Sequence, residues 1–204
     1  MTPTAAELGS IILAGGQSRR MGRNKALLRL EAGGPTLIER VVGAVSGFGP
    51  VLLVTNAPDE YAFLGLPMVP DAVGGQGPLA GLLAGLTASS AAHNFVLACD
   101  MPQLQPALLR YMAALPRDYD VLVPRWTAPD GTEQVETLHA IYSKACIPAV
   151  AACLARGERR MVGFYGDVRV LYLDEPELRA VDPDLAGFRN LNTPEDLEEL
   201  GLSR

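Results

Sequence analysis

Residues 13–25 read Leu-Ala-Gly-Gly-Gln-Ser-Arg-Arg-Met-Gly-Arg-Asn-Lys and continue a short apolar run that predicts a buried strand. The paired glycines Gly15 and Gly16 carry no side chain, so a ligand can approach their backbone N–H groups, and a run of such groups forms an anion-binding concavity. Four cationic residues follow: Arg19, Arg20, Arg23 and Lys25. A basic surface turn would have a similar composition. However, ligands of open α/β sheets bind beyond the carboxyl ends of strands, so the position favours a loop that binds a polyphosphate.

The spacing of the glycines excludes two common phosphate-binding loops. A Walker A loop places four residues between its first glycine and a Gly-Lys-Ser/Thr triplet, whereas Gly16 and Gly22 are one residue too far apart and Arg23 follows. The dinucleotide fingerprint G-x-G-x-x-G is absent after this strand. Residues 75–80 match G-x-G-x-x-A, but Pro78 removes an N–H group that such a site would use. A nicotinamide-dependent oxidoreductase is therefore disfavoured.

The composition indicates a folded protein that does not act on nucleic acid. The chain has 204 residues, of which 49% are hydrophobic, and this suits a domain with a sizeable core. Its 17 Lys and Arg against 23 Asp and Glu give a net charge of -6, which argues against a dedicated nucleic-acid binder. Three cysteines without C-x-x-C spacing predict neither a disulfide framework nor a zinc site. Because the sequence shows no signal peptide and no apolar run of about 20 residues, we expect a cytoplasmic protein without a membrane span.

Short apolar runs alternate with amphipathic segments along the chain, a pattern that is typical of β-α-β units. We expect strands at 10–13, 51–54, 68–69, 95–99, 121–123, 137–142 and 168–173. We expect helices from about residue 36 and at 79–88, 106–115, 145–155 and 194–200. Residues 125–134 include Pro, Asp and Gly and predict a loop near the active face. The prediction is one α/β domain over residues 1–204, with a mostly parallel central sheet and helices on both faces.

Asp100 directly follows the expected strand 95–99 and so stands at the carboxyl end of a central strand. Side chains in this position of a parallel sheet point into the ligand crevice. Mg²⁺ usually binds through one or two carboxylates together with substrate phosphates, which makes Asp100 a candidate metal ligand. For this residue alone, an aspartate that caps the following proline-containing turn is an equally good interpretation.

Residues 13–25 resemble the signature Leu-Ala-Gly-Gly-x-x-x-Arg-Met-Gly-x-Asp-Lys of nucleotidyltransferases with a three-layer Rossmann-like fold, and in particular the molybdenum cofactor guanylyltransferases. One residue departs from the signature, since Asn24 stands where the family usually has aspartate. Further similar motifs lie at 71–81, 99–102 and 188–197. The resemblance implies nucleotide contacts at Leu13, Ala14, Gly15, Gly16, Lys25 and Asp100, catalytic roles for Arg20, Lys25 and Asp100, and a metal ion on Asp100.

The same resemblance implies contacts with the base and with the acceptor. Asp71 precedes a Gly-Pro-Leu-Ala-Gly run, and a carboxylate there can accept two hydrogen bonds from guanine. Asn56 matches a polar residue that contacts the nucleotide. Asn190 and Asn192 lie in a segment similar to the closing motif Asn-x-Asn-Thr-Pro-Glu-x-Leu and would face the acceptor side. The alternatives are turn residues for Asn56 and Asp71, and a helix cap for the two later asparagines.

Two further groups of residues receive no role in the chemistry. His93 and His139 lack the spacing of metal ligands, so we assign neither to a metal. The basic turn at 157–160 would hold an acceptor phosphate in one interpretation and form a solvated helix end in the other, which we favour. No Ser/His/Asp or Cys/His set suggests a protein nucleophile.

The resemblance implies that the chain transfers GMP from GTP to the molybdopterin-bound molybdenum cofactor. The products would be the guanine dinucleotide cofactor and pyrophosphate, with Mg²⁺ as the metal. GTP and the molybdopterin-type cofactor would be the substrates, and cofactor-inserting proteins or molybdoenzymes would be transient partners. Two alternatives stay open, a cytidylyltransferase for the same cofactor and a non-catalytic carrier of that cofactor. The carrier would release no pyrophosphate.

Overall fold

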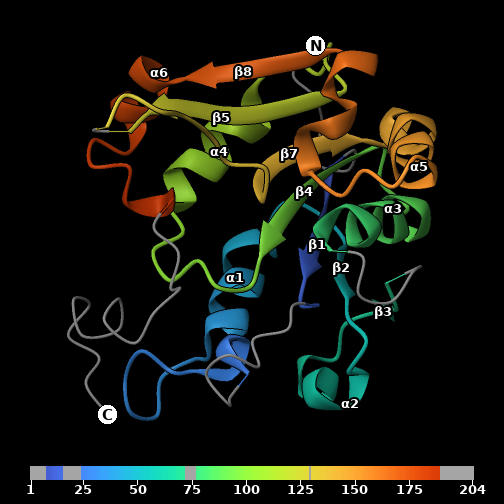
Figure 1. Ribbon diagram of the computed structural model, residues 1–204. Coiled ribbons are helices and arrows are strands. Elements are labelled where there is room, and N and C mark those ends of the chain that lie inside the picture. Colours follow the sequence, from blue (N-terminus) through green and yellow to red (C-terminus); the bar gives the residue numbers. More distant parts are fainter. Residues whose placement is uncertain (1–7, 16–23, 72–76, 129, 189–204) are drawn as a thin grey trace.

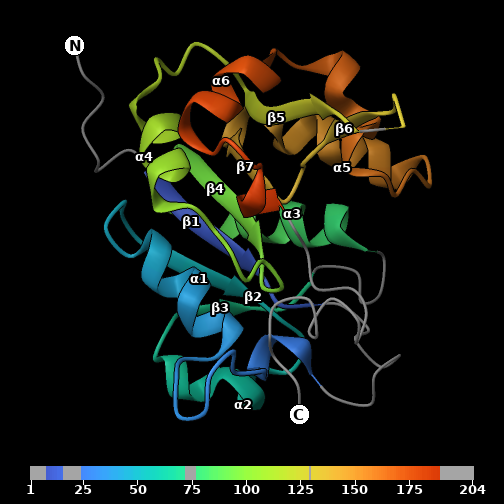
Figure 2. The same cartoon turned by 90° about the vertical axis from the view of Figure 1, so that its left-hand side faces the viewer.

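The computed structural model describes residues 8–15, 24–71, 77–128 and 130–188, which form a mixed β-sheet between two layers of helices (Figures 1 and 2). The strands are β1 (Leu8–Leu13), β2 (Val51–Val54), β3 (Met68–Val69), β4 (His93–Ala98), β5 (Val121–Thr127), β6 (Glu133–Val135), β7 (His139–Ser143) and β8 (Val170–Asp174). Their order in the sheet is β3-β2-β1-β4-β7-β5-β6, and β8 pairs with β5. The α/β fold predicted from the sequence is confirmed.

The direction of the strands divides the sheet into two halves. β1 runs parallel to both of its neighbours, β2 and β4, and β3 continues this parallel half beyond β2. β7 reverses the direction, because it is antiparallel to both β4 and β5. β8 is parallel to β5, whereas β6 is antiparallel to it. As a result β5 and β8 point the same way as β4, and their carboxyl ends lie at the same edge of the sheet.

One face of the sheet is covered by α1 (Leu37–Val45), α4 (Pro106–Ala114) and α6 (Glu175–Val181), and Figure 2 shows α1 and α4 on this side. Helix α1 begins at a capping box, in which the Thr36 hydroxyl accepts from the Glu39 N–H at 3.3 Å and the Glu39 carboxylate accepts from the Thr36 N–H at 2.7 Å. Its apolar residues Ile38, Val41 and Val45 are fully buried against the sheet, at the spacing of one helix face.

The opposite face is covered by α3 (Pro78–Ala88) and α5 (Ile147–Ala155), which also contact each other. Helix α3 lies very close to β1. A Cβ added to Gly85 would sit 2.5 Å from Cγ2 of Ile11, and a Cβ at Gly81 would sit 3.3 Å from Cδ2 of Leu13. These glycines therefore allow the backbone of α3 to approach the strand that precedes the predicted phosphate loop.

The structure corrects two expectations about the second half of the chain. Residues 125–134 are not a loop, because Arg125 pairs with Val135 and Trp126 with Gln134 in a β5–β6 hairpin. The Asp-Gly pair of this segment lies in the turn between the two strands. The helix expected at 145–155 opens as a 3₁₀ turn over Lys144–Cys146 before α5. The helix expected at 194–200 lies outside the described residues. Within the described ranges, every helix is too short or too polar to cross a bilayer.

Candidate active site

The carboxyl ends of four neighbouring strands meet at one edge of the sheet. Leu13 is in register with Val54 on β2 and with Ala98 on β4, and Val54 is in register with Val69 on β3. The residues that leave these strands therefore emerge side by side: Ala14 and Gly15, Thr55 and Asn56, Asp71, and Cys99 and Asp100. This edge is the place where a parallel sheet holds its ligand.

The first residues of the predicted phosphate loop are tied to the end of β2. The Ala14 N–H donates to the Val54 carbonyl at 2.9 Å, and the Ala14 carbonyl accepts from the Thr55 hydroxyl at 3.4 Å. A Cβ added to Gly15 would meet no atom of the described residues within 4 Å, so space is open beside its backbone. A ligand could use this space to approach the loop.

Lys25 and Asp100, which are far apart in the sequence, share this edge. Lys25 begins a 3₁₀ helix, Lys25–Leu27, whose cap is Asn24, and the Asn24 Oδ1 accepts from the Ala26 N–H at 3.1 Å. Burial raises the pKa of Asp100, and the nearby Lys25 ammonium opposes that shift. The structure thus brings together a cation and a partly desolvated carboxylate, two of the three residues predicted to be catalytic.

Asp100 suits a metal ion that is shared with a substrate. Its carboxylate is half-buried at the end of β4, where burial disfavours the charged form, and a bound cation would offset that cost. In the described part of the chain, no group of three or more His, Cys, Asp or Glu gathers to make an all-protein cage. Mg²⁺ needs only one or two carboxylates when phosphates and waters complete its shell, so a single aspartate fits. The adjacent Cys99 thiol stays protonated, since burial raises its pKa to about 12.

Asn56 and Asp71 are joined at the neighbouring strand ends. The Asp71 N–H donates to the Asn56 Oδ1 at 3.0 Å, which joins the segment after β3 to the segment after β2. Both residues are accessible rather than buried. The pair predicted to contact the nucleoside therefore lies together, with Asn56 holding the backbone of Asp71.

Four of the predicted site residues lie outside the described residues: Gly16 and Arg20 in the phosphate loop, and Asn190 and Asn192 in the closing motif. Their roles stay predictions. Leu13, the first predicted nucleotide contact, ends β1 and packs beneath Gly81 of α3.

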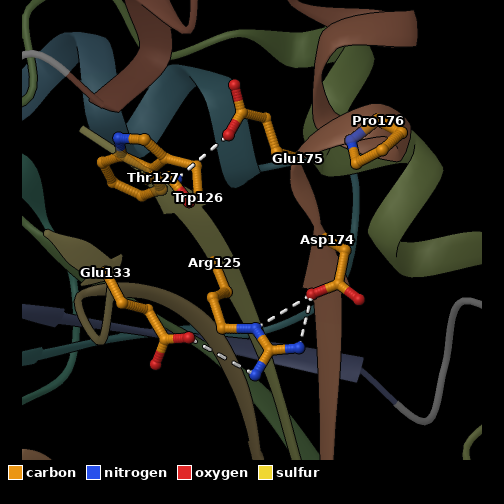
Figure 3. A pocket seen from close by; sticks show the side chains of 7 residues that line it. All are labelled: Arg125, Trp126, Thr127, Glu133, Asp174, Glu175 and Pro176. Atoms are coloured by element: carbon orange, nitrogen blue, oxygen red, sulfur yellow. Dashed lines mark hydrogen bonds and ion pairs between the residues drawn. The ribbon is translucent and has the colours of Figure 1, made fainter. Parts of the chain in front are cut away.

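A separate cavity of about 340 Å³ opens at the carboxyl ends of β5 and β8, next to the start of α6 (Figure 3). The Arg125 guanidinium donates to Asp174 Oδ1 at 2.7 and 2.9 Å and lies 3.7 Å from a Glu133 oxygen. The Thr127 N–H donates to Glu175 at 3.0 Å. Asp174 and Glu133 thus already engage this guanidinium, and Glu175 adds a third carboxylate to the lining, so this cavity is unsuited to a phosphate.

The residues that were given no chemical role have structural ones. His139 is fully buried on β7 with its ring 5.1 Å from that of Phe188, and burial lowers its pKa to about 4. In the basic turn, the Glu158 carboxylate accepts from the Arg159 and Arg160 N–H groups at 2.8 and 2.9 Å and pairs with the Arg160 side chain. The favoured interpretation of a solvated helix end agrees with these contacts.

Sequence reasoning missed three residues of this edge: Thr55, Glu60 and Tyr61. Thr55 holds the Ala14 carbonyl, and the other two belong to the short helix α2 (Pro58–Tyr61) and contact Asn24. The proline that opens α2 was a weak signal for the helix. Nothing in the sequence pattern connects α2 with the predicted phosphate loop, because the contact joins segments that follow two different strands.

Known proteins are similar to this chain over nearly its whole length. Residues 10–169 match the model of a family described as MobA-like NTP transferase domain. A protein from Pelotomaculum thermopropionicum, named probable molybdenum cofactor guanylyltransferase, is 42% identical over 188 residues, which cover 92% of this chain and 88% of that protein. A protein from Desulfosudis oleivorans, named molybdenum cofactor guanylyltransferase, is 37% identical over 192 residues, which cover 93% and 92%.

Solved structures show the same fold. The molybdopterin-guanine dinucleotide biosynthesis protein A from Archaeoglobus fulgidus is similar with a TM-score of 0.78 and 27% identity, over 94% of this chain and 96% of that one. A 2-C-methyl-D-erythritol 4-phosphate cytidylyltransferase from Thermus thermophilus has a TM-score of 0.71 at 17% identity, over 98% and 97% of the two chains, and so is alike in fold alone.

Proposed function

We propose a function that proceeds from one premise: the chain belongs to the MobA-like NTP transferase family. It is therefore a nucleotidyltransferase. Its reaction is the transfer of GMP from GTP to the molybdopterin-bound molybdenum cofactor, with formation of the guanine dinucleotide cofactor and release of pyrophosphate. The names of its relatives and their coverage of nearly the whole chain support this assignment.

The observation that carries the proposal is the position of Asp100 at the strand-end edge that also holds the open backbone of Gly15, with the Lys25 ammonium near enough to favour the charged carboxylate. The terminal phosphate of the acceptor attacks the α-phosphate of GTP in line, and pyrophosphate leaves. This chemistry depends mainly on positioning and on neutralising charge. Lys25 and Arg20 neutralise charge on the phosphates, while Gly15 and Gly16 donate backbone N–H groups.

Asp100 would hold the divalent metal that nucleotidyltransferases generally use, and we propose Mg²⁺ as that metal. Mg²⁺ on this carboxylate would neutralise charge on the nucleotide phosphates. The half-buried position of Asp100 supports this role, because a single carboxylate there leaves the remaining coordination to phosphates and water.

Asp71 would read the guanine base, since its carboxylate can accept from N1–H and from the exocyclic amine together. Asn56 supports this arrangement through its bond to the Asp71 N–H. Asn190 and Asn192 would line the acceptor side. One domain over residues 1–204, a cytoplasmic location and transient contact with cofactor-inserting proteins or molybdoenzymes stay predictions.

Titration calorimetry with GTP and with CTP, each with Mg²⁺, tests the proposal together with an assay of pyrophosphate release in the presence of the molybdenum cofactor. Preference for GTP with release of pyrophosphate is the expected result. Preference for CTP would instead indicate a cytidylyltransferase that carries out the same reaction with a different nucleotide. Binding of the cofactor without any pyrophosphate release would instead indicate a carrier.

A further inference from the structure

The Asn24 side chain makes a contact that no sequence motif predicts. Its Nδ2 donates to Glu60 Oε2 at 2.5 Å and to the Tyr61 hydroxyl at 2.8 Å, while its Oδ1 accepts from the Ala26 N–H at 3.1 Å. A primary amide has two hydrogens to donate, and here α2 receives both of them. Asn24 therefore ties the turn that carries Lys25 to the helix that follows β2, and Figure 2 shows that turn and α2 side by side.

The two partners on α2 differ in their surroundings. Tyr61 is only 2% exposed and belongs to the apolar core, so its hydroxyl is a fixed anchor. Glu60 is exposed and its carboxylate is the more adaptable partner. The turn that they hold, Lys25–Leu27, is a single three-residue 3₁₀ helix, an element with little stability of its own. Ala26 anchors this turn in the apolar core, while the Asn24 contacts hold the end of the turn that carries Lys25.

Only an amide at position 24 satisfies this set of partners. A carboxylate there could not donate to Glu60 and would place a second negative charge at hydrogen-bond distance from the first. The amide of Asn24 and the acid of Glu60 are thus matched, one as donor and the other as acceptor. If the two groups exchanged chemistry, with an acid at 24 and an amide at 60, the same bond would form with its direction reversed.

We propose that Asn24, with Glu60 and Tyr61, forms a clamp that positions Lys25 against the nucleotide phosphates. Asn24 is a positioning residue in this scheme, since it acts through Lys25. The proposal rests on the function proposed above, because it assigns Lys25 to the phosphates of GTP.

The test compares Asn24→Asp with the double variant Asn24→Asp/Glu60→Gln, which has the same net charge as the wild type. We expect Asn24→Asp to raise the Kd for GTP with Mg²⁺ and to lower kcat/KM by about 10- to 100-fold, the usual cost of losing a residue that orients a ligand group. The double variant should recover most of both losses. Asp59→Asn, which removes a neighbouring exposed carboxylate from α2, serves as the control and should match the wild type.

Calorimetry separates misplacement of Lys25 from loss of folded protein. Unfolding lowers the number of binding sites per chain and leaves Kd unchanged, whereas a displaced Lys25 raises Kd at full stoichiometry. Glu60→Ala, at an exposed position that cannot compromise the core, should raise Kd in the same direction as Asn24→Asp but less. An unchanged Kd in Asn24→Asp, or a double variant no better than the single one, would overturn the clamp. A wild type that binds GTP but releases no pyrophosphate would refute the proposed function alone, since the order of the Kd values still tests the clamp.

Discussion

Asp100 gives the most direct test of the chemistry at the scale of a single residue. Asp100→Asn keeps the size of the side chain but removes the charge that a divalent metal requires, so we expect Mg²⁺-dependent pyrophosphate release to fall by at least about 10²-fold. The assay is the steady-state rate with GTP and the molybdenum cofactor at varied Mg²⁺. Asp118→Asn is the matched control, because it removes an exposed carboxylate just before β5, at the opposite edge of the sheet. A wild-type rate in Asp100→Asn would contradict the metal assignment.

In the proposed site, Asn56 would act on the base through Asp71, and a single hydrogen bond joins the two residues. Asn56→Ala removes the acceptor of the Asp71 N–H, and a lost bond of about 1 kcal/mol corresponds to a KM for GTP about fivefold higher with little change in kcat. ITP, which lacks the exocyclic amine of guanine, supplies the comparison. The preference of the wild type for GTP over ITP should shrink in the variant. An undiminished preference would show that Asp71 does not need Asn56.

At the scale of elements, the distance between α3 and β1 is set by Gly85. In Gly85→Ala the new Cβ would meet Ile11 Cγ2 at 2.5 Å and Val54 Cγ2 at 3.2 Å, and overpacking of this kind costs about 1–3 kcal/mol. Chemical denaturation should show that loss of stability. Gly43→Ala is the control in an exposed part of α1, where the new Cβ meets no described atom within 4 Å and better helix propensity adds about 0.5–1 kcal/mol. Equal effects of the two variants would exclude the steric explanation.

The sequence predicts the elements of the parallel half better than those of the mixed half. The bounds of β2 and β3 agree with the prediction to the residue, and β2 is a continuous apolar run of the kind that is typical of a parallel sheet. The β5–β6 hairpin was missed because polar residues such as Arg125 and Gln134 interrupt the apolar pattern by which a strand is predicted. Helix α6 was missed as well, although Glu177 accepts from the Asp174 N–H at 3.2 Å as in a helix cap.

In the candidate site, features that depend on local sequence were predictable, whereas contacts between distant segments were not. The location of Asp100 and Asp71 at this edge was predictable because each lies two residues after the end of a strand, and strand ends share an edge. The bond between Asn56 and the backbone of Asp71, and the contacts of Asn24 with Glu60 and Tyr61, join side chains from separate loops. No local pattern encodes such pairs, so they required the three-dimensional arrangement.

For the molecule as a whole, His139 should make stability depend on pH. Its pKa is lowered from 6.5 to about 4 by burial, so the unfolded chain binds a proton that the folded chain excludes as the pH falls through 6.5. The free energy of unfolding should therefore decrease by about 1.4 kcal/mol between about pH 7.5 and about pH 5.5 from this residue alone. Urea denaturation at the two pH values measures the change. His139→Phe, which keeps a ring in contact with Phe188, should remove this part of the dependence, and an equal slope in the variant would contradict the assignment.

The protonated state of Cys99 has a practical consequence for experiments on this enzyme. The thiolate is the form that reacts with oxidants and alkylating labels, and burial holds the pKa of Cys99 and of Cys146 at about 12. Cys153, the remaining cysteine, is itself buried. We therefore expect the natural thiols to react slowly with maleimides, with the half-buried Cys99 the most accessible of the three. A cysteine engineered at an exposed position would then take up a fluorophore preferentially, so movements at the carboxyl ends of the strands could be followed without first replacing the natural thiols.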